Sequence, residues 1–388
     1  MEYSFDEVVL FARTGLNPRN NFKLGFGSNK YITIKNIRNN TLVVDENTDV
    51  VDDSAIELIH KRSQIKKGDV LFCSIGRMGD MYIIEADPVG WDINESVFAF
   101  TLDTSIIRPK YFYYIFKHRD TLNYLFNNSS GSTFKSIKMN QLKKMVFDLP
   151  SLEEQDYIVR VFDGIEYIII KHQQELSLLD NLIKARFVDM FGHQSHNEKG
   201  FPYKTIDDVA EIYLGITHTP EYVEEGVTFI SAKNTSGDYL DLSDVKYISR
   251  GEFETAPAGS KPKKNDVLFS RVGSNLGHPV ILEDDIELCT FVSLGFLRTK
   301  GKVTSNYLKH WMRDEFFPVQ VLEHVKGGGQ PNLNTGWLKQ FKIIVPDLDR
   351  QREFDAFCKQ TDKSKTVIQK ALDEAQLLFD SLMQQYFG

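Results

Sequence analysis

Two long stretches of the chain place apolar side chains at steps of three and four residues. The first covers residues 151–192 and the second covers residues 347–388, and neither contains a proline. Apolar periodicity of this kind predicts an amphipathic helix. Because a helix of about 40 residues extends over roughly 60 Å, we expect two unusually long helices, each with an apolar stripe that needs a partner.

The remainder of the chain shows a different pattern. Short apolar runs such as "YITIKN" at 31–36 and "DVLF" at 69–72 alternate with turns that contain Gly or Asn, which is typical of strands. Helical spacing returns at 109–126 and 305–322. This mixture predicts an α/β (α+β) fold, with two similar mixed α/β globules joined by the two long helices.

An internal repeat relates the two halves of the chain. Matching segments follow in the same order, separated by 196 to 201 residues. They are "YSFDEV" and "KTIDDV", "YITIKN" and "FISAKN", "KKGDVLF" and "KKNDVLF", "LPSLEEQ" and "VPDLDRQ", and the helix ends "MFG" and "YFG". Such ordered self-similarity predicts a duplication, with a globule at 1–150, a helix at 151–192, a second globule at 193–346 and a second helix at 347–388.

The repeated "LPSLEEQ" and "VPDLDRQ" junctions predict where the helices begin. A proline ends the preceding strand, and Ser151 and Asp347 are then suited to cap the helix. The apolar stripes favour an antiparallel, coiled-coil-like pair, although two independent surface helices remain an alternative. The residues that we expect to pack between the helices are Ile165, Leu179, Leu182, Ile368, Leu378 and Leu382.

Composition restricts the class of protein. The chain of 388 residues has a net charge of −8. Eight acidic against four basic residues lie in 151–192, and eight against six lie in 347–388, so the globules are nearly neutral. There is no apolar run long enough for a membrane span and no secretory signal pattern. The three isolated cysteines fit reduced thiols, so we expect a cytoplasmic protein.

Motifs that would carry catalysis are missing. The sequence has no "GxxxxGK[ST]" phosphate loop and no Asn-Pro-Pro-aromatic stretch for adenine methylation. The acidic pair in "PDLDR" is better explained as a helix cap. His193 and His196 lie in a polar linker without acidic or cysteine partners, so they are weak metal candidates. We therefore expect no catalytic residue, no metal and no cofactor on this chain.

The repeated pattern resembles the specificity subunit of type I restriction–modification systems. The resemblance rests on "GSTFKSIKMNQLKKMVFDLPSLEEQ" (131–155) and "GGGQPNLNTGWLKQFKIIVPDLDRQ" (327–351), and it covers essentially the whole chain. It implies that each globule reads one half of a split target in double-stranded DNA. It also implies that the helices bind two methyltransferase subunits, that restriction/translocase subunits join the complex, and that AdoMet and ATP bind these partners.

Candidate DNA contacts lie in loops where polar donors stand beside glycine. Asn can read adenine, Lys and Arg can bind phosphate or guanine, and glycine permits close backbone approach; for each single residue an ordinary solvated turn is the alternative. For the first globule the candidates are Lys35, Asn36, Ser74, Arg77, Ser132, Thr133 and Lys135. For the second they are Lys233, Asn234, Arg271, Ser274, Asn275, Gly328, Gln330 and Asn332.

Two other functions remain open at this stage. One is an enzyme of the methyltransferase or nuclease type, against which the missing motifs argue. The other is a helical scaffold that joins proteins without binding DNA, which a salt-dependent DNA-binding measurement would distinguish.

Overall fold

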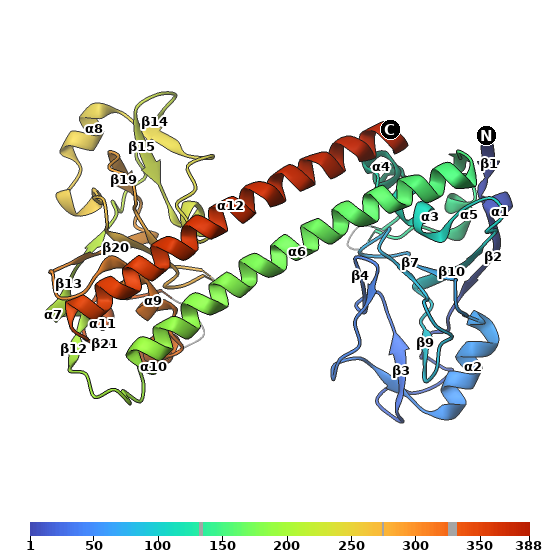
Figure 1. The fold of residues 1–388 in the computed structure, drawn as a ribbon, viewed down its shortest axis with the longest axis horizontal. Helices are drawn as coiled ribbons and strands as arrows, with labels where there is room; N and C mark the ends of the chain where they lie inside the picture. The colour runs from blue at the N-terminus through green and yellow to red at the C-terminus, as the bar shows by residue number, and fades with distance from the viewer. Residues whose placement is uncertain (132–134, 274, 325–331) are drawn as a thin grey trace. The chain divides into compact units, whose positions relative to one another are not determined.

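A computed structural model describes residues 1–131, 135–273, 275–324 and 332–388. The chain forms two compact units. Unit 1 consists of Met1–His172 and Ala371–Gly388, and unit 2 consists of Gln173–Lys370. Two helices of 40 residues, α6 (Leu152–Phe191) and α12 (Leu348–Phe387), contribute to both units and are the two long ribbons of Figure 1. Their bounds match the predicted helices to within one residue.

Unit 1 is built on an antiparallel four-stranded sheet of order β2-β10-β7-β8. A smaller sheet of order β6-β3-β9 contains the parallel pair β3 and β9. Two antiparallel pairs, β1 with β11 and β4 with β5, complete the strands. Their bounds are β1 (Glu2–Ser4), β2 (Val9–Thr14), β3 (Asn29–Ile32), β4 (Ile37–Arg38), β5 (Thr41–Leu42), β6 (Val50–Val51), β7 (Val70–Cys73), β8 (Met81–Ile83), β9 (Trp91–Ile93), β10 (Val97–Leu102) and β11 (Val146–Asp148).

The shorter helices of unit 1 cover its sheets. They are α1 (Phe5–Val8), α2 (Asp53–Ser63), α3 (Pro109–Ile115), α4 (Arg119–Asn127) and α5 (Met139–Leu142). Local sequence explains the bounds of α2, because the Asp52 carboxylate accepts from the Ala55 amide and Gln64 ends the helix in the left-handed conformation. The core is rich in aromatic side chains, among them Phe5, Phe100 and Phe112.

Unit 2 repeats this plan. Its main sheet has the order β13-β20-β17-β18, its smaller sheet has the order β14-β16-β15-β19, and β12 pairs with β21. Strands β15 and β19 are again a parallel pair. The bounds are β12 (Tyr203–Thr205), β13 (Ala210–Leu214), β14 (Tyr222–Val223), β15 (Val227–Ile230), β16 (Lys246–Ile248), β17 (Val267–Ser270), β18 (Pro279–Ile281), β19 (Leu288–Thr290), β20 (Leu294–Thr299) and β21 (Lys342–Ile344).

The helices of unit 2 lie at corresponding places in the chain. They are α7 (Ile206–Val209), α8 (Arg250–Thr255), α9 (Ser305–Arg313), α10 (Phe316–His324) and α11 (Thr335–Leu338), with 3-10 turns at Ala232–Thr235 and Ala258–Ser260. The common order of strands and helices confirms the duplication. No helix in the described ranges is both long and apolar enough to cross a membrane.

Two of the repeated sequence features have a local structural cause. In "KKGDVLF" and "KKNDVLF" the aspartate is buried, and its carboxylate accepts from the backbone amide three residues earlier, at Lys66 and Lys263. An arginine then neutralises each carboxylate, Arg13 for Asp69 and Arg298 for Asp266. The motif is therefore needed to fold the turn before a central strand.

A glycine also recurs where two strands approach closely. A Cβ atom on Gly15 would lie 1.7 Å from the Ile93 carbonyl oxygen, and one on Gly215 would lie 2.3 Å from the Phe291 carbonyl oxygen. Both glycines directly follow the first strand of the main sheet. A side chain at Gly15 or Gly215 would therefore push the end of β2 or β13 away from the backbone at β9 or directly after β19.

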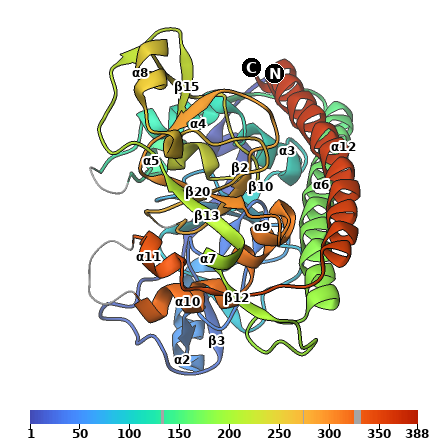
Figure 2. The ribbon, with the colours of Figure 1, turned by 90° about the vertical axis from the view of Figure 1, so that its left-hand side faces the viewer.

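In each unit a part of α6 packs against a part of α12, and Figures 1 and 2 show the two helices side by side. In unit 1 the Phe162 ring contacts Phe379 edge-on, with ring centroids 5.2 Å apart. In unit 2 Phe187 contacts Phe354 in the same manner at 5.5 Å. In unit 2 the two helices are antiparallel, because Asp180 of α6 pairs with Lys365 of α12 and the later Arg186 pairs with the earlier Glu353.

The predicted packing positions are only partly correct. Ile165 is buried and Leu382 packs against the core of unit 1, whereas Leu179 and Ile368 are half-buried. The prediction is wrong for Leu182 and Leu378, which are 48% and 51% exposed. The next residues in the chain, Ile183 and Phe379, face inward instead.

Candidate nucleic-acid interface

In unit 1 three loops meet at one end of the main sheet. They are the loop after β3, the loop after β7 and the segment before α5. Arg77 Nη2 donates to the Ile34 carbonyl oxygen at 2.9 Å, which joins the first two loops. The Gly76 amide donates to the Lys135 carbonyl oxygen at 3.2 Å, which joins the second and third. We call the described residues 33–36, 74–80 and 135–137 loop cluster 1.

Loop cluster 1 presents basic side chains to solvent. Lys35 and Lys135 are exposed, and the Arg77 side chain keeps 41% of its surface exposed despite an ion pair with Asp80 at 3.7 Å. The Lys135 ammonium contacts only the Phe126 carbonyl oxygen and the Phe126 ring among the described residues. The structure therefore brings together three of the predicted contact residues, and their charge suits phosphate.

Asn36 and Ser74 require a correction, because both are buried. The Asn36 amide oxygen accepts from the Thr33 amide at 3.0 Å, and its nitrogen donates to the Val43 carbonyl oxygen at 3.0 Å and to the Thr48 hydroxyl. The Ser74 hydroxyl donates to the Ser96 carbonyl oxygen at 2.7 Å. Both side chains are buried and use their hydrogen bonds inside unit 1, which argues against the predicted DNA contact for these two residues.

In unit 2 the corresponding three loops also meet, but different hydrogen bonds join them. Asn275 Nδ2 donates to the Ser236 carbonyl oxygen at 3.4 Å, and the His278 ring bonds to the Gly237 carbonyl oxygen at 2.8 Å. The Leu333 amide donates to the Arg271 carbonyl oxygen at 2.9 Å. We call the described residues 231–237, 271–273, 275–278 and 332–334 loop cluster 2.

Arg271 fastens loop cluster 2 together. Its guanidinium donates to the carbonyl oxygens of Val292 at 3.0 Å and Leu333 at 3.3 Å and to Asn332 Oδ1 at 3.4 Å. Burial lowers the pKa of the Arg271 guanidinium. Three of the five N–H donors of Arg271 are used in this way, so the residue positions its neighbours, and its predicted DNA contact stays a prediction.

The other predicted residues of loop cluster 2 divide into buried and exposed groups. Asn234 is buried, and its nitrogen donates to the carbonyl oxygens of Asp241 and Asp244, which argues against its predicted base contact. Lys233 is exposed but forms an ion pair with Asp244 at 2.8 Å. Asn275 and Asn332 remain exposed. Loop cluster 2 is thus richer in amides, whereas loop cluster 1 is richer in cations.

The remaining predictions cannot be placed. Ser132, Thr133, Ser274, Gly328 and Gln330 lie outside the described residues. The contact of His278 with the loop after β15 was missed by sequence reasoning. The sequence signal for this contact is the position of His278 directly after the glycine-containing turn at 271–277, which pairs with the turn at 74–80 in the first half.

The described residues offer little for catalysis. Across 1–131, 135–273, 275–324 and 332–388, no group of three His, Cys, Asp or Glu side chains is arranged to hold a metal. His193 and His196 face each other edge-on, with ring centroids 6.2 Å apart. The loop clusters provide hydrogen-bond donors and positive charge on two globules of the same fold.

Comparison with known proteins gives a consistent result. The model of the type I restriction modification DNA specificity domain matches residues 3–179 and 198–376. The type I restriction enzyme MjaIX specificity subunit of Methanocaldococcus jannaschii is 22% identical over 61% of this chain, although the chain spans only 58% of that relative. The putative MjaX specificity subunit of the same organism is 24% identical, over 94% of this chain and 89% of the relative.

Solved structures share the fold. The type I restriction–modification S subunit from M. genitalium has a TM-score of 0.60 at 13% identity, with 100% of this chain and 96% of that chain covered. A chain from a study of complex assembly and conformational transition of the type I system has a TM-score of 0.56 at 18% identity, covering 100% and 97%.

Proposed function

This chain belongs to the type I restriction–modification DNA specificity family, and we propose from this membership that it is the subunit that reads a bipartite DNA target. Unit 1 would read one half of the target, here called a half-site, and unit 2 would read the other. The observation that carries this assignment is the repeat itself. The two units share the strand order of the main sheet, and each gathers three loops at one end of it.

The different chemistry of the loop clusters supports two different half-sites. Loop cluster 1 offers the ammonium groups of Lys35 and Lys135 and the guanidinium of Arg77, which suit phosphate and guanine. Asn275 and Asn332 offer amides, which suit adenine. Two readers of one fold with different contact residues would select an asymmetric target. Their common scaffold explains why they engage two grooves of the same duplex in similar ways.

The long helices are proposed to bind the partner subunits. Two methyltransferase subunits and the restriction/translocase subunits would complete the complex. Apolar side chains that remain exposed on α6 and α12 support this role, because large exposed apolar groups commonly mark protein interfaces. They include Tyr157, Tyr167, Leu178, Val367 and Leu377.

The chemical steps are proposed to reside in those partners. AdoMet and ATP would bind them, and this chain would carry no catalytic residue or cofactor of its own. The absence of a phosphate loop and of a methyltransferase motif in the sequence supports the assignment. The three cysteines are buried free thiols, which suits a reducing cytoplasm.

The experiment combines DNA binding with methyl transfer. The full chain with its cognate methyltransferase subunits should bind duplex DNA in a salt-dependent manner and transfer methyl groups from AdoMet. The chain alone should transfer none. Turnover by the chain alone would support the enzyme alternative, and a complex without DNA affinity at low salt would support the scaffold alternative.

A further inference from the structure

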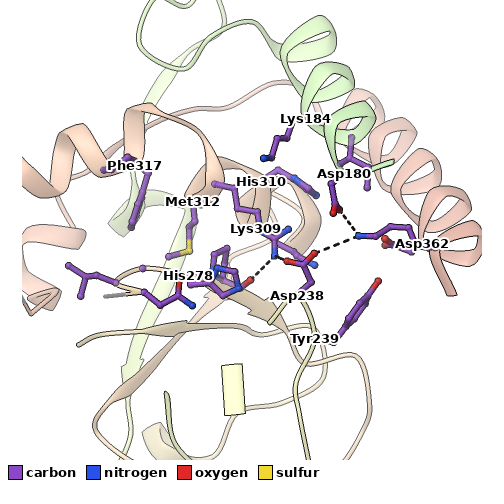
Figure 3. A pocket seen from close by; sticks show the side chains of 18 residues that line it. Asp180, Lys184, Asp238, Tyr239, His278, Lys309, His310, Met312, Phe317 and Asp362 are labelled. Carbon is purple, nitrogen blue, oxygen red and sulfur yellow. Dashed lines mark hydrogen bonds and ion pairs between the residues drawn. The ribbon is translucent and has the colours of Figure 1, made fainter. Parts of the chain in front are cut away.

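Unit 2 contains a polar cavity of about 420 Å³ between its helices and loop cluster 2. Its walls come from α9, from the parts of α6 and α12 that belong to unit 2, and from residues 275–279 (Figure 3). Asp238 and Tyr239, which follow loop cluster 2 in the chain, form another wall. Residues of loop cluster 2 and residues of the helices therefore line the same cavity.

Lys309 is the unusual residue of the cavity. The residue is only 8% exposed, and no carboxylate of the described residues forms an ion pair with its ammonium. Burial lowers the pKa of Lys309 and Arg313 lowers it further, whereas the carboxylates of Asp362, Asp238 and Glu283 act in the opposite direction from beyond ion-pair distance. A buried ammonium without a counterion is costly, so its retention at this position requires a reason.

Most of the charged side chains next to Lys309 form ion pairs with one another. Arg313 pairs with Asp238 at 2.7 Å, and Lys365 pairs with Asp180 at 2.6 Å and Asp238 at 3.6 Å. Burial keeps the pKa of His310 well below its usual value, so that ring is neutral. Arg313 Nε is buried and has no partner among the described residues. After these ion pairs are formed, the cavity keeps the Lys309 ammonium without an ion pair and Arg313 Nε without a hydrogen bond, while the Asp362 carboxylate also lines it.

The fold does not require this lysine. The equivalent position in unit 1, 196 residues earlier, is Tyr113. The next residue is Tyr114, where unit 2 has His310, and its hydroxyl lies 2.6 Å from the Asp163 carboxylate and 2.9 Å from the Glu166 carboxylate. One copy of the repeat therefore has tyrosines at these two positions, and the other has a cavity lined by a lysine without an ion pair.

We propose that the cavity of unit 2 binds a phosphate group, with the Lys309 ammonium as its main counterion. Lys184, which also lines the cavity, supplies a second positive charge, and the Tyr239 ring, 49% exposed, borders the opening. Lys and Arg are the usual phosphate ligands in proteins. The phosphate comes either from the DNA backbone or from a free phosphate compound. Binding of a DNA phosphate would rest on the proposed function, whereas binding of a free phosphate compound would not.

The test uses the full chain and inorganic phosphate. Melting temperature is measured in sodium phosphate and in sodium chloride of equal ionic strength, for the wild type and for Lys309→Met. Phosphate strengthens burial in any protein by exclusion, so the informative quantity is the difference between variants. The wild type should gain stability from phosphate beyond this general effect, because a ligand that binds only the folded state stabilises it. Lys309→Met should lose that excess.

Two further variants keep the result interpretable. Lys309→Tyr introduces the residue that unit 1 carries, so it should fold and should also lose the excess stabilisation. Lys264→Met removes an exposed lysine of the same unit and should behave as the wild type. Equal phosphate responses of the wild type and both Lys309 variants would overturn the proposal, as would a wild type without any excess response.

DNA binding then identifies the source. If the DNA backbone is the ligand, Lys309→Met should weaken binding to all sequences alike and reduce the salt slope by about one. Unchanged DNA affinity together with a lost phosphate response identifies a free phosphate compound. Failure of the complex to bind DNA at all would contradict the proposed function. It would not affect the phosphate test, because the melting temperature is measured without DNA.

Discussion

Gln155 Oε1 accepts a hydrogen bond from the Arg108 backbone amide at 2.9 Å. The same glutamine donates to the carbonyl oxygens of Ile106 and Pro150, both at 3.0 Å, and it is fully buried. Gln351 repeats the arrangement with the Thr304 amide at 2.9 Å and the carbonyl oxygens of Lys302 and Pro346. The glutamine of each repeated junction therefore ties the start of a long helix to its globule.

Replacement of Gln351 by alanine should destabilise unit 2. It leaves the partly buried Thr304 amide, the Lys302 carbonyl group and the buried Pro346 carbonyl group without this partner, and a buried unsatisfied group costs about 1–3 kcal/mol. Urea unfolding followed by circular dichroism measures the loss. Gln360→Ala, an exposed position on the same helix, is the matched control. Equal stability of the two variants would show that the junction does not depend on this side chain.

Replacement of Arg271 by lysine should loosen loop cluster 2 while retaining the charge. A single ammonium cannot reproduce donations to Val292, Leu333 and Asn332. We expect methylation of the natural target to fall and selectivity to relax at one half-site only. Methylation mapping with the cognate methyltransferase reports both, with the exposed Arg352→Lys as control. Relaxation at both half-sites would contradict the assignment of one unit to each.

Removal of exposed charge from loop cluster 1 should weaken DNA binding without changing its sequence preference, if these lysines meet phosphate. For Lys35→Ala and Lys135→Ala, the slope of log K against log salt should fall by about one unit each. Lys61→Ala, on the exposed face of α2, should leave the slope unchanged. A change confined to one base position would instead indicate that the lysine reads a base.

The contact between helices should depend on Phe162 and much less on Leu182. Phe162 is fully buried and contacts Tyr114, Phe379 and Phe387. Phe162→Ala should therefore cost about 3–5 kcal/mol of unfolding free energy. Leu182→Ala removes a half-exposed side chain and should change stability by about 0.5 kcal/mol or less. Similar losses for both variants, measured in urea, would mean that the packing face is misassigned.

Much of the fold was predictable because it is encoded locally. The caps are an example, since the Glu154 amide donates to the Ser151 hydroxyl at 3.3 Å and the Arg350 amide donates to the Asp347 carboxylate at 2.9 Å. These contacts span three residues of sequence. The duplication was predictable for a different reason, because two copies of one sequence must fold in the same way.

The packing face of the helices was harder to predict. In α6 the apolar residues Leu182 and Ile183 are adjacent, and in α12 Leu377, Leu378 and Phe379 are consecutive. Spacing alone then fits more than one helical face. The tertiary contacts of unit 2 select Ile183, and those of unit 1 select Phe379.

Side-chain roles in the loops depend on distant residues. Arg271 was assigned to DNA because it stands beside a glycine turn, yet its acceptors lie 21 to 62 residues away in the sequence. Asn36 and Asn234 are used within their own loops, by carbonyl groups 7 to 10 residues later. No local pattern distinguishes such an asparagine from one that is free to read a base.

The central claim is that each unit reads one half-site, and mapping of methylated bases tests it most directly. Cells would express the cognate methyltransferase with either the natural chain or a chain whose Asn275 and Asn332 are replaced by serine. The natural chain should direct methylation to a split sequence with an unread gap. The variant should alter one half of that sequence and preserve the other half and the gap. A continuous target, or a variant that changes both halves, would contradict the account.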